Sequence, residues 1–281
     1  MNMQQDSIHL AAERQERIHA LITERGTLRV DELAEILSVS LATIRRDLLE
    51  LDRRGLVKRV HGGAMSVRNR VVEPMFDDKT SIASAEKQAI AAAAYHDIES
   101  SDTIFLDGGS TILALARLLQ GRDDVKVVTN SLRVATLLAG GGPRLILIGG
   151  HLRHLSQTFV GPLTEPILSE LHVDKAFMGT IGLSLDAGLT TTDADEAFTK
   201  KRVMRCANRV LLLADASKIG KVAFAHAGDI ADLDVLITDD GIDQQTRESI
   251  EKNHVDIICV TPGTPHQTPR QTAINHLAQP A

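Results

Sequence analysis

The alternation of apolar and amphipathic segments between residues 103 and 260 is the feature that most constrains this fold. Short apolar runs predict buried strands, which we place at 103–106, 125–129, 144–148, 174–179, 210–214, 235–238 and 257–260. Helical periodicity predicts helices at 87–96, 112–119, 131–138, 163–171, 196–207 and 243–254. Because helices that connect buried strands indicate a mostly parallel sheet, we expect an α/β domain over residues 81–260.

Residues 13–64 have a different pattern, which predicts a small helical domain ahead of the sheet. The predicted elements are a helix at 13–24, a strand at 27–30, helices at 31–37 and 41–54, and a strand at 56–60. Only three residues, 38–40, separate the second helix from the third, which is the spacing of a helix-turn-helix. The last strand and the glycine turn at 61–63 add a wing.

The third of these helices has one apolar face and one polar face. Ser40 can cap its N-terminus, because the hydroxyl can accept an amide proton from the first turn. A buried stripe is predicted at helical spacing, formed by Leu41, Ile44, Leu48 and Leu51. The residues that lie mostly off this stripe are Ala42, Thr43, Arg45 and Arg46. Thr43 and the two arginines can reach the base edges or phosphates of a nucleic acid.

The distribution of charge agrees with this interpretation, although the net charge of the chain is −6. Residues 1–63 carry ten basic and ten acidic side chains, so the negative excess lies in the remainder. Residues 40–63 contain six basic and three acidic side chains. The positive excess is therefore concentrated where nucleic acid would lie.

Length and composition limit the class of protein. A chain of 281 residues with 43% hydrophobic content favours two domains with sizeable cores. No apolar run has membrane-spanning length, and the polar N-terminus has no signal-peptide core. The two cysteines, Cys206 and Cys259, lack metal-ligand spacing, so we expect buried thiols in a cytoplasmic protein. Residues 1–12 and the proline-containing tail 261–281 are expected to be disordered, and 65–80 to be a linker.

Glycine-bearing or polar loops follow three of the predicted strands. The first is Asp107-Gly108-Gly109-Ser110-Thr111, which opens a helix and so exposes backbone amides to an anion. It matches neither a Walker sequence nor the dinucleotide GxGxxG pattern, and an ordinary tight turn is the alternative. The other two loops contain Thr129-Asn130-Ser131 and Gly149-Gly150-His151-Leu152-Arg153. Because loops after parallel strands gather at one sheet edge, a small anionic ligand is expected there.

Each polar residue of these loops also has a simpler interpretation. Asn130 and Ser131 can be plain helix caps, and His151 and His154 fit an exposed loop better than a metal site. Later along the chain, carboxylates lie near lysines at strand ends, at Asp193, Glu196, Asp215 and Lys218. They can hold sugar hydroxyls and a phosphate, or form a solvated helix face. The sequence contains no Ser-His-Asp or Cys-His set and no cluster with metal-ligand spacing.

From about residue 13 to 260 the chain resembles the DeoR-type bacterial transcriptional regulators. The most specific motif runs from Val39-Ser40 through Thr43-Ile44-Arg45-Arg46-Asp47-Leu48, followed by Gly55, Arg59 and His61-Gly62-Gly63-Ala64. Sensor motifs match in order, namely Glu86-Lys87, Leu106 to Thr111, Thr129 to Ser131, Gly149 to Arg153, and Asp215-Ala216-Ser217-Lys218. The stretch 149–159 is similar to regulators of amino-sugar use. Two departures are Gly109 and the Leu41-Ala42 pair, where many members carry other residues.

The resemblance implies a sensor fold like that of ribose-5-phosphate isomerase and a phosphorylated sugar as effector. It implies that the glycine loop takes the phosphate and that Lys79, Lys87, Asp215 and Lys218 take part in the inducer response. The full set of expected effector-binding residues is Lys79, Lys87, Asp107, Gly108, Gly109, Ser110, Thr111, Thr129, Asn130, Gly150, Arg153, Asp193, Glu196, Asp215 and Lys218. The expected DNA-binding residues are Ser40, Ala42, Thr43, Arg45, Arg46, Arg59 and His61, the last two on the wing.

Together these features predict a repressor of a sugar-catabolism operon, released by a sugar phosphate and needing no cofactor. One reading helix per subunit is too little for a unique genomic site, so a homodimer or homotetramer on double-stranded operator DNA is expected. One alternative is a sugar-phosphate isomerase or deaminase that uses Asp193, Glu196 and Lys218. Another is a nucleic-acid-binding module whose second domain only oligomerises.

Overall fold

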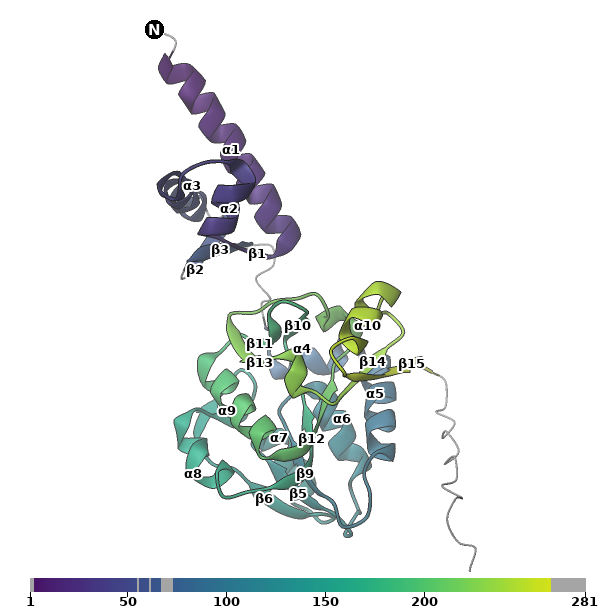
Figure 1. Cartoon of the computed structure of the whole chain (residues 1–281). Helices are drawn as coiled ribbons and strands as arrows, with labels where there is room; N and C mark the ends of the chain where they lie inside the picture. The colour runs from purple at the N-terminus through teal and green to yellow at the C-terminus, as the bar shows by residue number, and fades with distance from the viewer. Residues whose placement is uncertain (1–2, 55, 61, 67–72, 264–281) are drawn as a thin grey trace, which may run out of the picture.

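The computed structural model describes residues 3–54, 56–60, 62–66 and 73–263, which fold into two parts (Figure 1). Residues 3–66 form the head, and residues 73–263 form the α/β domain. Each part has its own apolar core, since the buried side chains of the head form a cluster separate from the two clusters of the α/β domain. The predicted order, a small helical domain ahead of an α/β domain, is confirmed. Residues 264–281 of the expected tail lie outside the described residues.

The head is a winged helix-turn-helix. Its elements are α1 (Met3–Arg25), β1 (Thr27–Arg29), α2 (Val30–Leu37), α3 (Leu41–Arg53), β2 (Val57–Val60) and β3 (Gly63–Ser66). The three strands form an antiparallel sheet in the order β1-β3-β2. Helix α2 ends where Ser38 adopts a left-handed conformation with φ of 53°. Helix α3 begins after Ser40, whose Oγ accepts the Thr43 amide proton at 3.2 Å, as the capping prediction required.

Three details of the head and cysteines differ from expectation. Helix α1 begins at Met3, not near residue 13, because the preceding residues contain good helix formers and no glycine or proline. Leu41 is 46% exposed and so does not belong to the buried stripe, since the first turn of α3 extends beyond the core formed by Ile44 and its neighbours. Cys206 and Cys259 are free thiols but only partly buried.

The α/β domain is built on a seven-stranded parallel sheet in the order β15-β14-β12-β9-β4-β5-β6. The strands are β4 (Thr103–Leu106), β5 (Lys126–Thr129), β6 (Arg144–Leu147), β9 (Val173–Met178), β12 (Ala207–Leu213), β14 (Val235–Asp239) and β15 (Asp256–Val260). All seven predicted strands lie in this sheet, and every neighbouring pair is parallel. The prediction of a mostly parallel α/β domain is therefore confirmed.

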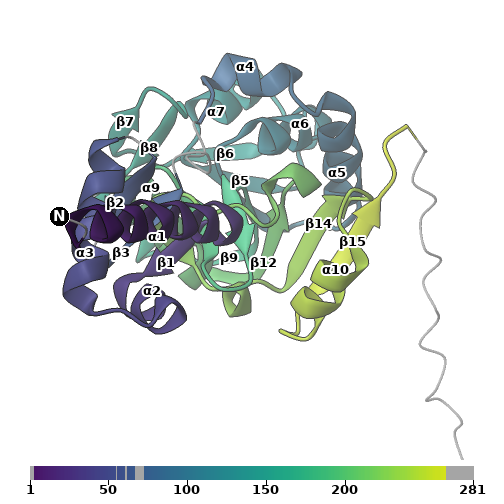
Figure 2. The same cartoon turned by 90° about the horizontal axis from the view of Figure 1, so that it is seen from above.

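Helices cover both faces of this sheet (Figure 2). One face packs against α5 (Ser84–His96), α6 (Ser110–Leu118) and α7 (Leu132–Leu138). The other packs against α8 (Glu165–Leu168), α9 (Ala194–Arg205) and α10 (Gln244–Glu251). No helix in the described ranges is long and apolar enough to cross a membrane.

The structure also contains elements that the sequence pattern did not indicate. These are the hairpin of β7 (His151–Arg153) with β8 (Thr158–Val160), and a small antiparallel sheet of β10 (Gly182–Ser184), β11 (Gly188–Thr191) and β13 (Ala225–Gly228). Three short 3-10 turns are η1 (Pro162–Thr164), η2 (Ala216–Lys218) and η3 (Ile230–Asp232). The expected linker 65–80 is partly structured, since β3 includes Met65 and Ser66, and α4 spans Phe76–Ser81. The expected helix 163–171 is shorter because it divides into η1 and α8, each with a proline in its first turn.

The strand order contains one topological switch point. From β4 the chain adds β5 and β6 on one side, whereas from β9 it adds β12, β14 and β15 on the other. At the carboxyl ends of β4 and β9 the following segments therefore leave in opposite directions and open a crevice. Ligands of open α/β sheets bind at such a crevice, which makes this edge the place to search for a site.

The head depends on a buried carboxylate in the reading helix. Asp47 of α3 accepts hydrogen bonds from Arg14 Nε at 2.6 Å and Arg14 Nη2 at 3.2 Å, and from Gln15 Nε2 at 3.1 Å. We expect Arg14→Ala to destabilise the head by about 1–3 kcal/mol, because it leaves a buried charge poorly satisfied. Hydrogen–deuterium exchange of the α3 amides should accelerate. The control is Arg17→Ala, an exposed arginine of the same helix, and equal exchange in both variants would contradict the prediction.

Candidate functional site

The first candidate site is the outer face of α3. Ala42, Arg45 and Arg46 are exposed and Thr43 is half-buried, while Ile44, Leu48 and Leu51 pack into the head. Among the described residues, neither Arg45 nor Arg46 forms an ion pair, so both guanidinium groups are available to phosphates or base edges. The exposed Leu41 adds an apolar group at the start of the same helix.

The wing lies next to α3 in the chain and presents further basic groups. Lys58 and Arg59 of β2 are both exposed. The Arg59 amide donates to Asp52 Oδ1 at 3.1 Å, which ties the wing to the end of α3 while leaving the guanidinium outside. His61, the other expected wing contact, lies outside the described residues. The head therefore carries an unpaired basic surface on two adjacent elements, as a nucleic-acid interface requires.

The second candidate site is a cavity at the switch point of the sheet. Its empty volume is about 610 Å³, which includes space open to solvent. Its lining comes from the segment after the head, the glycine loop, the loops after β9 and β12, and α9. The lining residues are Glu73, Phe76, Lys79, Lys87, Gly108, Gly109, Ser110, Thr111, Ile112, Ser156, Gly179, Thr180, Ile181, Glu196, Lys200, Leu213, Ala214, Asp215 and Lys218.

The glycine loop forms one wall, at the N-terminus of α6. Gly109 precedes the helix with φ of 129°, a conformation that residues with a side chain rarely adopt. Gly108 passes so close to the β7–β8 hairpin that an added Cβ would lie 2.2 Å from Thr158 Cγ2. The first amides of α6 have no carbonyl partner within the helix. The wall therefore offers N–H groups and the positive end of a helix dipole to an anion.

Three lysines of other segments, Lys79, Lys87 and Lys218, also line the cavity. Lys87 Nζ donates to the carbonyl oxygens of Lys79 and Ile82 at 2.6 and 2.5 Å. Burial lowers the pKa of Lys87 below its usual 10.5, and the nearby Lys218 and Lys79 add to this, although Asp215 opposes it. Burial likewise lowers the pKa of Lys218, again against the attraction of Asp215. Clustered ammonium groups with lowered pKa values are typical of a site that awaits a negative charge.

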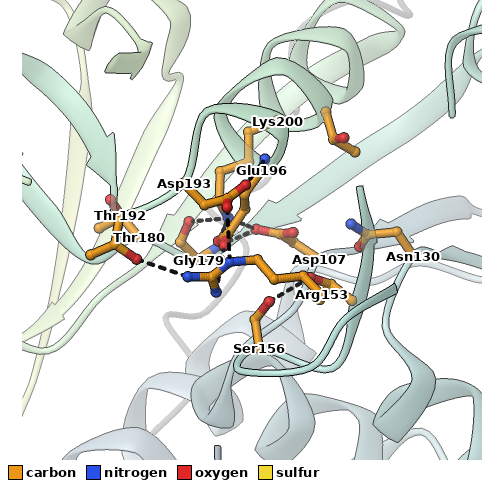
Figure 3. Close-up of polar contacts among 12 residues, drawn as sticks. Asp107, Asn130, Arg153, Ser156, Gly179, Thr180, Thr192, Asp193, Glu196 and Lys200 are labelled. Carbon is orange, nitrogen blue, oxygen red and sulfur yellow. Dashed lines mark hydrogen bonds and ion pairs between the residues drawn. The ribbon is translucent and has the colours of Figure 1, made fainter. Parts of the chain in front are cut away.

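The floor of the cavity is a buried ion pair. Lys200 of α9 contacts Asp107 Oδ2 and also donates to the Gly179 carbonyl at 2.9 Å, while the Gly179 amide donates to Asp107 Oδ2 at 3.1 Å (Figure 3). Burial opposes the charged ammonium, but Asp107 and Glu196 outweigh it and raise the pKa of Lys200. The pair therefore joins the end of β4, the end of β9 and α9.

Arg153 forms a second charged cluster behind the cavity wall. Its guanidinium lies 2.8 Å from Glu73 Oε2, 3.2 Å from Glu196 Oε2 and 3.4 Å from Asp193 Oδ2. It also donates to Thr192 Oγ1 at 3.0 Å. Figure 3 shows Arg153 extending toward Thr192, Asp193 and Glu196. Arg153 and Asp193 do not line the cavity themselves, so they act on it through Glu73 and Glu196.

The structure brings together most of the expected effector residues. Nine of them line the cavity, namely Lys79, Lys87, Gly108, Gly109, Ser110, Thr111, Glu196, Asp215 and Lys218. Asp107 lies beneath it in the ion pair with Lys200.

The remaining expected residues have structural partners elsewhere. Thr129 donates to the Leu106 carbonyl at 2.6 Å, and Asn130 donates to the Phe159 carbonyl at 3.1 Å. Gly150 packs against the β8 backbone and Thr164. Ser131 caps α7 by accepting the Val134 amide proton, which is the simpler interpretation that the sequence had left open. These positions therefore support the loops and do not line the cavity.

Sequence analysis did not single out several lining residues, including Glu73, Phe76, Ser156, Gly179, Thr180 and Lys200. Gly179 ends the expected strand 174–179 and Thr180 follows it, so the rule that selected the glycine loop could have selected them. Glu73 and Phe76 were assigned to a linker, and Lys200 was one of three basic residues on a helix. Within the described residues no group of His, Cys, Asp and Glu side chains could hold a metal ion.

A basic reading head joined to an α/β domain with a lysine-lined cavity at its switch point defines a DNA-binding protein with a sensor domain. Residues 14–70 match the DeoR-like helix-turn-helix domain, and residues 82–240 match the DeoR C-terminal sensor domain. The chain belongs to the DeoR family of transcriptional regulators.

Relatives match over nearly the whole chain. It is 36% identical to the HTH-type transcriptional regulator GlpR of Haloferax volcanii, over 89% of this chain and 98% of the relative. It is 38% identical to the lactose phosphotransferase system repressor of Streptococcus mutans, over 81% and 91%. Among solved structures, ribose 5-phosphate isomerase A of Methanocaldococcus jannaschii aligns with 22% identity over 47% of this chain and 53% of that chain. Its TM-score of 0.36 is too low to carry an argument.

The floor of the cavity gives a test of its structural role. We expect Lys200→Met to destabilise the α/β domain by about 3–5 kcal/mol, because Asp107 then remains buried without its partner. Adding Asp107→Asn should restore part of the loss, since the unpaired charge is removed. Urea unfolding followed by far-ultraviolet circular dichroism measures both. Lys201→Met, at the next position of α9, is the control, and a Lys200→Met variant as stable as this control would refute the prediction.

Proposed function

We propose that this regulator represses a carbohydrate-catabolism operon and leaves its operator when a phosphorylated sugar occupies the cavity. The observation that carries the proposal is that the N-terminus of α6 and three lysines, Lys79, Lys87 and Lys218, line the same cavity. A phosphate group fits such a lining because it accepts several N–H hydrogen bonds and satisfies clustered ammonium groups. Ser110 and Thr111 supply hydroxyl donors at the same place.

The rest of the cavity suits the sugar part of such an effector. Glu196 and Asp215 line it and can accept hydrogen bonds from hydroxyl or amino groups. Apolar side chains of Phe76, Ile112 and Ile181 provide surface for the carbon skeleton. An amino-sugar phosphate is the member of this class that places a positive group near the carboxylates. The printed name of the Streptococcus mutans relative, a lactose phosphotransferase system repressor, supports a carbohydrate role.

The proposal includes a symmetric homo-oligomer in the cytoplasm. Each head offers one reading helix of 13 residues, α3, and one such helix contacts too few bases for a unique genomic site. A dimer or tetramer on repeated half-sites of double-stranded DNA supplies the missing contacts. A phosphorylated sugar that favours another arrangement of the heads then lowers operator affinity, with a coupling of about 1–3 kcal/mol.

The alternative is an enzyme that isomerises or deaminates a sugar phosphate. One observation favours it, namely that Glu196 and Lys218 both line the cavity, although Asp193 does not. Glu196 is also held by Lys200 and Arg153, which limits its freedom to move a proton. Turnover of ribose 5-phosphate or glucosamine 6-phosphate by the full-length protein would revive this alternative.

We expect Arg45→Ala to weaken specific operator binding by about 1–3 kcal/mol if Arg45 pairs with a guanine. The operator fragment is selected from random-sequence DNA by the wild-type protein, and dissociation constants are measured by fluorescence anisotropy. Arg25→Ala, an exposed arginine of the head outside α3 and the wing, is the control. An equal loss on unselected DNA would reassign Arg45 to a phosphate contact, and no loss would remove it from the interface.

We expect Lys218→Met to weaken the binding of a phosphorylated sugar by about 10- to 100-fold, because a hydrogen bond to a charged group is lost. Isothermal titration calorimetry tests glucosamine 6-phosphate, ribose 5-phosphate, fructose 1-phosphate and glycerol 3-phosphate, with glucose as the uncharged comparison. Lys221→Met is the matched control, because Lys221 is exposed and outside the cavity lining. The effector class is wrong if no phosphorylated compound binds the wild-type protein or shifts its operator affinity.

The same titration has an expected pH dependence. Lys87 and Lys218 have pKa values below 10.5 because of burial. Their attraction for a phosphate is complete below the lowered pKa values and is lost as the pH rises through them. Affinity should therefore begin to fall at a lower pH than an ordinary lysine would give, and the fall should be smaller in Lys218→Met. Parallel pH profiles of the two proteins would exclude Lys218 as the titrating group.

A further inference from the structure

Glu73 lies between the head and α4 and is close to both in sequence. Ser66, the last residue of β3, precedes it by seven positions. Although it lies next to the connection between the two parts, its side chain is only 2% exposed. A carboxylate so deeply buried requires strong partners, and three are present.

The three partners of Glu73 come from different elements. Lys79 of α4 contacts Oε1, Thr192 after β11 donates its hydroxyl proton to Oε2, and Arg153 Nη2 donates to Oε2 at 2.8 Å. Burial alone would raise the pKa of Glu73, but Arg153, Lys79 and Thr192 outweigh burial and lower it to about 2. The carboxylate is therefore charged at every physiological pH and fixes the start of the α/β domain.

Two of these partners also connect Glu73 to the ligand cavity: Lys79 lines it, and Arg153 contacts a residue that lines it. Lys79 lines the cavity and pairs with Glu73, so its ammonium can serve either Glu73 or an anion in the cavity. Arg153 pairs with Glu196, which lines the cavity and lies 3.6 Å from Lys200. A ligand that contacts Lys79 or Glu196 thus acts directly on the partners of Glu73.

The opposite side of the network faces the wing. A second cleft is lined by Lys58 and Arg59 of β2 and by Glu73, Arg153 and Thr192 of the α/β domain. Glu73 and its partners therefore lie between the cavity and the element expected to contact DNA. Glu73 itself lines both the ligand cavity and the cleft beside the wing.

We propose that Glu73 is a latch that couples occupancy of the cavity to the placement of the head. An anionic ligand draws Lys79 toward its own oxygens and so removes one of the donors that hold Glu73. The carboxylate then has fewer partners in a buried place, which favours an arrangement with this segment released and the head displaced from its operator geometry. The inference rests on the proposed function, and it adds a positioning residue that does not itself need to touch the sugar.

The test uses Glu73→Gln in the full-length protein, since glutamine keeps the size of the side chain and removes its charge. The probe is the member of the phosphorylated panel that most weakens operator binding of the wild-type protein. Two quantities are measured for each protein: probe affinity without DNA, by calorimetry, and operator affinity with and without the probe, by anisotropy. Glu99→Gln, the same substitution at an exposed glutamate of the α/β domain, is the matched control.

We expect Glu73→Gln to bind the probe at least as tightly as the wild-type protein, because Glu73 lines the cavity and its charge no longer competes for Lys79. Operator affinity should already be reduced, and should change by less than about twofold on adding the probe. Glu99→Gln should behave as wild type. A merely structural effect would lower both affinities together without changing the ratio between operator affinities with and without probe. The latch is refuted if Glu73→Gln keeps the wild-type ratio, or if probe binding is lost with it.

A second variant covers the case in which Glu73→Gln does not fold, as judged by circular dichroism. Thr192→Val removes one donor to Glu73, keeps the shape of the side chain and leaves the cavity lining intact. Thr192→Val should also reduce the effect of the probe on operator affinity, by a smaller amount than Glu73→Gln. If the ratio of operator affinities with and without the probe stays at the wild-type value, the latch is overturned. A wild-type protein that no panel member releases from DNA overturns the proposed function itself, and the latch with it.

Discussion

The buried ion pair between Asp107 and Lys200 holds together three of the segments around the cavity, namely the end of β4, the end of β9 and α9. Strands β4 and β9 pair up to Leu106 and Phe177, and beyond these residues the chain leaves the two strands in opposite directions. Lys200 reaches into the gap between them from α9 and bonds both Asp107 and the Gly179 carbonyl. Burying two charges carries a large desolvation cost, which these added hydrogen bonds offset. This contact therefore fixes the glycine loop after β4 relative to the end of β9 and to α9.

The sheet could be predicted because each strand is a short apolar run buried on both faces, a signal that local sequence carries by itself. The order of the strands could not, because pairing between β4 and β9 joins residues some seventy positions apart. For the same reason Asp107 and Gly108 were found from their loop, whereas Lys200 was not. Nothing near Lys200 in sequence distinguishes it from Lys201, and only the fold shows that one is buried against Asp107.

Two expectations, a linker at residues 65–80 and a buried Leu41, differ from the structure for a common physical reason. Residues 65–80 resemble a linker in sequence because α4 contains few apolar residues. In the structure Phe76 packs into the core, and Glu73 is buried with its charge paired to Lys79 and Arg153. Leu41 looks like a core residue because its spacing from Ile44 is helical, yet it lies in the first turn, beyond the reach of the other helices. Periodicity reports which residues share a face, but burial also depends on where the element ends and what lies opposite.

Charge balance around the cavity explains why an anion would change the structure and not simply fill a space. Four lysines and three carboxylates line it, and Glu73 and Glu196 are already engaged by Arg153. Among the described residues Lys218 is the lining lysine whose ammonium has neither a hydrogen bond nor an ion pair. A phosphate carries up to two negative charges, more than Lys218 alone can balance. If it also draws on a lysine that already has a partner, Lys79, shared with Glu73, is the one whose loss would be felt beside the head.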